Sequence, residues 1–117
     1  MKIDIQTPTA DLYDCQAENF AKSFNKPESS QLRHFYNELL KLEQIALKST
    51  PEQWGNTLPL VRMLNAKVAY AKGRTLVDDT FYSVFSSIIK SIESPAHLTN
   101  AKRFIESTIG FKKLHHK

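Results

Sequence analysis

The chain has 117 residues, of which 41% are hydrophobic and 24% are charged, and its net charge is +4. This composition excludes a wholly disordered chain and allows one domain with a modest core, while three glycines and five prolines are too few for the turns of a small all-β protein. The single cysteine, Cys15, excludes an internal disulfide and a multi-cysteine metal site, and favours a reducing, cytoplasmic location.

Residues 1–9 show no sustained hydrophobic period, and we expect a loosely held lead-in. Met1 to Gln6 include an early acid and no continuing apolar run, which argues against a signal peptide. We also find no stretch long enough to cross a bilayer.

Two helices are predicted in the first half of the chain. The first should run from about residue 11 to Phe24, because apolar residues recur at helical spacing and acids gather near its start. Asn25, Lys26 and Pro27 end it. Ser29 or Ser30 can cap a second helix, which should run to about Lys48 before Thr50 and Pro51 stop it.

A connection containing Trp54 and Gly55 should follow. Trp54 either anchors this connection to the core or stacks on a nucleic-acid base. The clearest helix comes next, from about Pro59 to Gly73, since proline suits a first helical turn and glycine the left-handed position past a helix end.

Two further helices complete the prediction. One starts at Asp78 and Asp79 and reaches Ile92, and the last spans about residues 96–113. Gly110 within the last helix indicates a close approach of a neighbouring backbone. Residues 114–117 should be frayed. The sequence therefore predicts an all-α protein, a compact bundle of about five helices forming one domain over residues 1–117.

Positive charge is concentrated on two of the predicted helices. The central helix region carries Arg62, Lys67, Lys72 and Arg74, with no acid between Glu52 and Asp78. On the second helix, a polar stripe of helical spacing contains Arg33, Asn37, Lys41, Gln44 and Lys48. Glu38 and Glu43 fall off that line, so we expect the stripe to be basic along its length. Together with Lys113, these cations indicate a surface that binds phosphates.

Catalytic patterns are missing from the sequence. The four histidines are scattered, no glycine-rich phosphate loop is present, and Cys15 has no context that lowers its pKa. A small buried or half-buried thiol is the usual fate of such a cysteine. Asp78 and Asp79 either bind a metal or favour a helix start through the dipole. We expect no enzyme activity, no cofactor and no metal.

Three stretches together resemble a known family: Ser30 to Leu39, Leu58 to Arg74 with its Lys67-x-x-Tyr70-Ala71-x-Gly73-Arg74 core, and Ile105 to Lys113. In this order and spacing they resemble the small helical subunit of the Csm complex, the type III-A CRISPR interference assembly. The similarity covers most of residues 29–113.

The resemblance implies a non-catalytic subunit that stacks in several copies as an inner filament, beside the backbone subunits that hold the crRNA. It implies contact with crRNA and paired target RNA, and with a large Cas10-type subunit at the filament end. The RNA-contacting positions that it carries over are Arg33, Lys67 and Arg74. Charge placement adds five further candidates: Lys41, Lys48, Arg62, Lys72 and Lys113.

Alternatives remain both for single residues and for the function of the whole protein. Arg74 could instead interact with a helix dipole, and Arg33 could pair with an acid of the first helix. The whole protein could be a helical adaptor whose basic faces dock an acidic partner without touching RNA, or a small enzyme.

Overall fold

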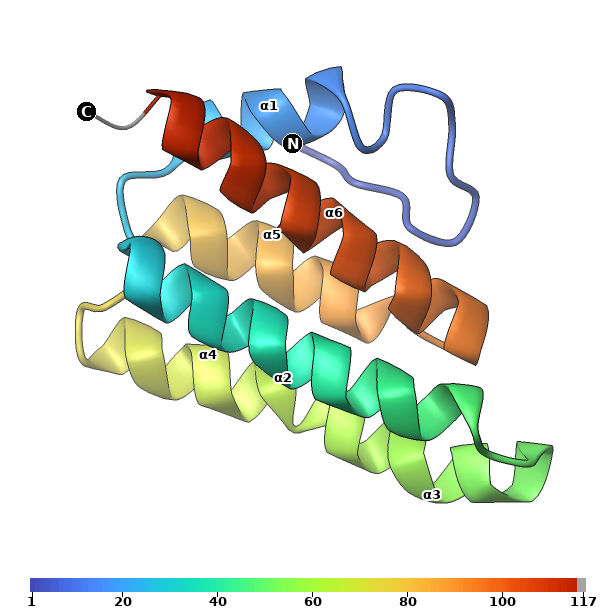
Figure 1. Ribbon diagram of the computed structural model, residues 1–117. Helices are drawn as coiled ribbons and strands as arrows, with labels where there is room; N and C mark the ends of the chain where they lie inside the picture. The colour runs from blue at the N-terminus through green and yellow to red at the C-terminus, as the bar shows by residue number, and fades with distance from the viewer. Residues whose placement is uncertain (116–117) are drawn as a thin grey trace.

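The computed structural model describes residues 1–115, which form six α-helices and no strand (Figure 1). The helices are α1 (Cys15–Ser23), α2 (Ser29–Leu47), α3 (Pro51–Arg62), α4 (Leu64–Gly73), α5 (Asp79–Lys90) and α6 (Pro95–His115). The Cα atoms span 44 × 34 × 21 Å, and since a helix is about 10 Å across, the body is about two helices thick. The predicted all-α bundle is confirmed.

The longest helix, α6, lies between α1 and α2 and packs against both (Figure 1). Helix α2 also packs against α3, while α4 packs mainly against α5. The N-terminal segment and α1 lie beyond α6, far from α3 and α4. One exposed face of α2 is therefore flanked by α6 on one side and by α4 on the other.

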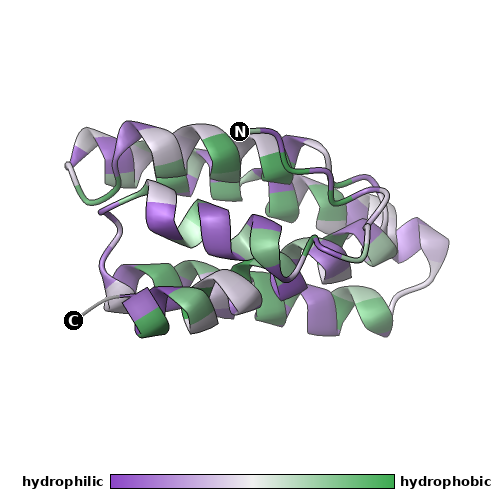
Figure 2. Ribbon diagram, turned by 90° about the horizontal axis from the view of Figure 1, so that it is seen from above, coloured by the Kyte–Doolittle hydropathy of each residue, from purple (hydrophilic) through white to green (hydrophobic). Residues whose placement is uncertain are grey.

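Aromatic rings fill the centre of the bundle. Phe81 of α5 is fully buried, and its ring centroid lies 5.7 Å from that of Phe20, 5.8 Å from that of Phe35 and 5.3 Å from that of Phe85. The Phe20 ring also stacks on Phe104 of α6 at 5.6 Å. Hydrophobic and hydrophilic residues alternate around the helices in Figure 2, and each helix contributes buried apolar residues to the core.

The lead-in predicted to be loosely held is instead part of the core. Ile5 is completely buried and Ile3 is 9% exposed. The Asn100 side-chain amide donates to the Ile5 carbonyl at 2.9 Å, and the Gln6 amide donates to the Ser91 carbonyl at 2.7 Å. Two isoleucines gave no periodic signal because the segment is short and not helical.

The predicted connection around Trp54 is wrong, because α3 begins at Pro51. Thr50 and Gln53 form a capping box, in which each side chain accepts a hydrogen bond from the other residue's backbone N–H. The Trp54 indole donates to the Glu93 carbonyl at 3.0 Å and packs on the core, which supports the anchoring role.

The central helix predicted from Pro59 to Gly73 is broken at Met63. Pro59 lies inside α3 rather than in a first turn, so the missing hydrogen bond is the one to the carbonyl four residues earlier, while Met63 N–H still donates to the Pro59 carbonyl at 3.0 Å. The chain turns at Met63 and resumes as α4. Residues 51–73 thus form two consecutive helices.

Other local predictions also differ from the structure. The residue with positive φ after α4 is Thr75, at 59°, and Gly73 ends the helix with ordinary φ. A Cβ at Gly110 would meet nothing within 4 Å, so no neighbouring backbone approaches it closely. The first helix starts at Cys15 rather than near residue 11, and the Cys15 side chain is exposed. His115 belongs to α6 and contacts Glu18, while residues 116–117 lie outside the described residues.

Candidate nucleic-acid interface

The exposed face of α2 carries the polar stripe that the sequence indicates. Its five members are all exposed: Arg33, Asn37, Lys41, Gln44 and Lys48. Successive members are three or four residues apart, so they follow one line along the helix. Three cations and two neutral polar side chains thus face solvent on one helix.

Arg33 at the start of this line faces a hollow between α2 and α6. The hollow has a volume of about 440 Å³, and its lining includes Leu32, Arg33, Ile109 and Lys113. Within residues 1–115, neither Arg33 nor Lys113 forms an ion pair, and both side chains are exposed. The two cations come from segments 80 positions apart in the chain, and the fold places them on one hollow.

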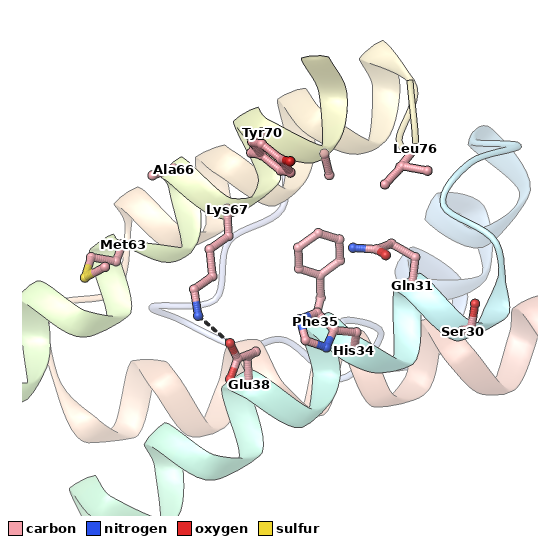
Figure 3. A pocket seen from close by; sticks show the side chains of 11 residues that line it. Ser30, Gln31, His34, Phe35, Glu38, Met63, Ala66, Lys67, Tyr70 and Leu76 are labelled. Atoms are coloured by element: carbon pink, nitrogen blue, oxygen red, sulfur yellow. Dashed lines mark hydrogen bonds and ion pairs between the residues drawn. The ribbon is translucent and has the colours of Figure 1, made fainter. Parts of the chain in front are cut away.

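The expectation that the α2 stripe is free of acidic partners is wrong for Lys41. Glu38 Oε2 lies 3.8 Å from Lys41 Nζ, and Glu38 Oε1 accepts a hydrogen bond from Lys67 Nζ across the space between α2 and α4 (Figure 3). The Lys67 hydrogen bond is the main reason that the pKa of Glu38 is lowered. Glu38 therefore stays ionised at neutral pH and competes with any phosphate for Lys67.

Arg74 is held against an aromatic side chain at the end of α4. Its guanidinium carbon lies 5.8 Å from the Tyr70 ring centroid, and Nη1 donates to the Tyr70 hydroxyl at 3.2 Å. Arg74 also occupies the C-cap position of α4, where a cation interacts favourably with the helix dipole. Arg74 is exposed, so its position is compatible with both alternatives, contact with RNA and interaction with the helix dipole.

Two of the other candidate cations have protein partners. Arg62 Nη2 donates to the Ile92 carbonyl at 2.7 Å, while its buried Nε has no partner within the described residues, so Arg62 joins α3 to the end of α5. Lys72 Nζ lies 2.8 Å from Asp79 Oδ1, and the hydrogen bond to Asp79 raises the pKa of Lys72.

The eight sequence-predicted cations therefore do not form one continuous patch. Arg33, Lys41 and Lys48 share the α2 face, with Lys113 beside Arg33. Lys67 lines the space between α2 and α4, and Arg74 is hydrogen-bonded to Tyr70, which also lines it. Arg62 points to the end of α5.

Residues 7–117 match the Csm2 Type III-A family, which is essentially the whole chain. The chain belongs to this family. It is accordingly a small subunit of the type III-A CRISPR Csm complex, and the family is structural and generally non-catalytic. No curated protein and no solved structure is detectably similar to the chain.

Two further lysines of this Csm2-family chain stabilise the fold. Lys112 Nζ donates to the Ala21 carbonyl at 3.0 Å and to the Phe24 carbonyl, at the C-terminal end of α1. Burial lowers the pKa of Lys112. Lys102 lies 3.7 Å from both Glu43 and Glu106. Sequence spacing could not separate these lysines from the exposed ones, because their partners come from distant segments.

The side chains that could carry chemistry are dispersed or engaged elsewhere. Within residues 1–115, no three histidine, cysteine, aspartate or glutamate side chains lie close enough to hold a metal ion. Asp78 instead accepts hydrogen bonds from the backbone N–H groups of Phe81, Asn25 and Lys26. Desolvation and the nearby Asp11 carboxylate raise the pKa of the Cys15 thiol. In the same described range, no helix is long and apolar enough for a membrane crossing.

Sequence reasoning missed the open groove between α2 and α4. It has a volume of about 760 Å³, and Phe35 and Gln31 from α2 and Lys67 and Tyr70 from α4 surround it (Figure 3). The one available signal was Tyr70, a large aromatic residue off the buried stripe of its helix, which is 65% exposed.

Proposed function

We propose that this chain is the non-catalytic RNA-binding small subunit of a cytoplasmic Csm complex that acts in antiviral defence. In this proposal, copies of the subunit stack along the path of crRNA and target RNA and contact the RNA backbone. Family membership over residues 7–117 supports a place in the complex. The RNA contact rests on the exposed cations.

The observation that carries the proposal is the row of Arg33, Lys41 and Lys48 on the exposed face of α2, with Lys113 beside Arg33. Exposed cations bind a polyanion by releasing its condensed counterions, without reading its sequence. A row with few contacts binds weakly by itself because salt screens each one. Repetition of the row in stacked subunits would multiply the contacts on one RNA.

The structure suggests an order among the candidate RNA contacts. Arg33, Lys48 and Lys113 come first, because they are exposed and have no ion pair within residues 1–115. Lys41, Lys67 and Arg74 come next, since each is accessible but already has a neighbouring partner. Lys72 and Arg62 come last because of their bonds to Asp79 and to the Ile92 carbonyl.

Exposed apolar side chains support contact with protein subunits as well. Leu60 is 49% exposed, Met63 53% and Leu47 66%, and exposed apolar surface of this kind is available for contact with another protein. We infer that they contact a neighbouring copy, a backbone subunit or the large Cas10-type subunit.

The test is fluorescence anisotropy with labelled single-stranded RNA over a salt series. Replacing both Arg33 and Lys113 by alanine should weaken binding about tenfold at low salt. It should also make the negative slope of log K against log salt shallower by about 1.4, since each lost contact removes about 0.7. The fold should survive, because both side chains are exposed.

The matched control is Lys90→Ala, which removes an exposed cation from α5. It should change the slope little. Because it removes one cation rather than two, a loss in log K half as large as that of the double variant would mean that only net charge matters. If the unaltered chain binds no RNA at low salt, with or without the other subunits, the proposal fails and the adaptor for an acidic protein is favoured.

A further inference from the structure

The groove between α2 and α4 is open and unfilled by either helix. It exists because α2 packs on α6 and α3, whereas α4 packs mainly on α5, so the two helices border a space of about 760 Å³. Ligand pockets for small molecules have volumes of about 300–1,000 Å³. The groove is therefore large enough for a planar heterocycle with its sugar.

One wall of this groove presents an aromatic ring to solvent. Tyr70 is 65% exposed, and its hydroxyl is fixed by Arg74 Nη1 at 3.2 Å. Apolar side chains also line the groove, among them Phe35 of α2 and Ala66 and Ala71 of α4. An exposed aromatic ring is a surface on which unpaired bases stack, whatever their sequence.

The rim of the groove carries polar side chains that are available to hydrogen-bond a ligand. Ser30, Gln31 and His34 line it, and within residues 1–115 their side chains form no hydrogen bond. Together they provide donors and acceptors, which the edge of a base requires and the apolar face of a protein helix does not. This chemistry favours a base over a helix as the occupant.

Cations lie where phosphates flanking such a base would pass. Lys67 Nζ bonds to Glu38 partway along the groove, and Arg74 lies at the Tyr70 end. We propose that the α2–α4 groove is a nucleobase pocket that receives one unpaired base of a single-stranded RNA, with Tyr70 as its stacking surface. The inference rests on the proposed RNA-binding function and assigns it a second, base-dependent contact.

The test compares two ligands with equal backbone charge, using the full chain. One is a single-stranded oligoribonucleotide, and the other is an abasic ribose-phosphate oligomer of the same length. Tyr70→Ala should weaken binding of the first about tenfold and leave binding of the second unchanged. Tyr70→Phe, the matched control, keeps the ring and should stay within about twofold of the original affinity for both ligands. An equal effect of Tyr70→Ala on both ligands would overturn the proposal.

A second measurement is independent of backbone binding. In a nuclear magnetic resonance titration with adenosine and uridine monophosphates, the methyl signals of Ala66 and Ala71 should shift, and Tyr70→Ala should abolish the shift. If the mononucleotides shift these signals but the oligonucleotide does not bind, the pocket proposal is supported and the proposed backbone-binding function is contradicted. If neither nucleotide shifts these methyl signals, the pocket proposal is wrong. This includes the case in which the signals change with protein concentration because a second copy of the chain fills the groove.

Discussion

At the scale of single residues, the neighbours of each cation decide what it can bind. Arg33 and Lys113 are exposed on one hollow without an ion pair within residues 1–115, whereas Lys67 is bonded to Glu38 and Lys112 to backbone carbonyls at the end of α1. All four are basic residues on helices, and their sequence context does not distinguish them. The available positive surface is therefore smaller than the count of lysines and arginines suggests.

Glu38 is predicted to restrain RNA binding. Replacing it by glutamine removes the carboxylate that holds Lys67 and lies 3.8 Å from Lys41, so both cations become free to meet phosphate. RNA affinity at low salt should rise about threefold, and the free energy of unfolding should fall by at most about 1 kcal/mol, as for a solvent-accessible ion pair. Anisotropy and urea denaturation measure the two effects.

Glu52→Gln is the control for this change, because it removes one negative charge from the exposed first turn of α3. A gain of the same size in both variants would show that the effect of Glu38 is one of net charge alone. A loss of affinity in Glu38→Gln would mean that the Lys67 bond orients the lysine for RNA.

At the scale of helices and loops, Asp78 joins two parts of the chain. One carboxylate oxygen caps α5 by accepting from Phe81 N–H at 3.0 Å, and the other accepts from Asn25 N–H at 2.9 Å in the loop between α1 and α2. Partial burial would raise the pKa of Asp78, but these backbone hydrogen bonds together outweigh it and lower the pKa. The ionised form is thus the one that the fold stabilises.

The pH dependence of stability follows from this direction. Since the folded pKa lies below the unfolded value of 3.8, the contribution of Asp78 is complete above that value and is lost as the pH falls through the folded pKa. Asp78→Asn should lower the unfolding free energy by about 1 kcal/mol at pH 7, the difference between charged and neutral hydrogen bonds. Urea denaturation at pH 7 and pH 3 should show this gap closing at the lower pH.

Asp79→Asn serves as the comparison. It makes the same change of charge at the next residue, where the Asp79 side chain is 90% exposed. Its effect on the unfolding free energy should be smaller at pH 7. A gap for Asp78→Asn that persists at pH 3 would contradict the role of the ionised carboxylate.

At the scale of the whole molecule, a chain of phenylalanine rings connects four helices. Phe104 of α6 stacks on Phe20 of α1, which stacks on Phe81 of α5, which lies against Phe35 of α2. The cluster lies under the α2 face that carries the proposed RNA contacts, since Phe35 comes from the buried side of that helix. If the cluster is disrupted, we expect α2 and α6 to separate, so that Arg33 and Lys113 no longer lie on one hollow.

Phe81→Ala is the corresponding prediction. It removes a fully buried ring that lies against four other phenylalanine rings, so the free energy of unfolding should fall by about 3–5 kcal/mol, a large share of the ~5–15 kcal/mol available to a domain. Phe111→Ala, at a partly buried position, should cost about 1–2 kcal/mol. Thermal denaturation followed by circular dichroism checks the order, and similar losses for the two would show that the cluster is not central.

Several features could be predicted from the sequence because they depend on residues close together in the chain. Helical spacing of apolar residues determined the all-α fold and the polar line from Arg33 to Lys48. The three quoted stretches identified the family, which matches over residues 7–117. The start of α3 also has a local sequence signal, because Thr50 and Gln53 form a capping box. We interpreted Pro51 as the end of the preceding helix rather than as the first residue of a new one.

The remaining features depend on contacts between distant segments, and only the tertiary structure decided them. The Ile5 carbonyl bonds to Asn100, Lys67 pairs with Glu38 from another helix, and Arg62 bonds to the Ile92 carbonyl after α5. The groove beside Tyr70 likewise arises from the way α2 and α4 pack on different partners. Periodicity fixes which side of a helix is apolar, but the charge available on the other side depends on which helix becomes its neighbour.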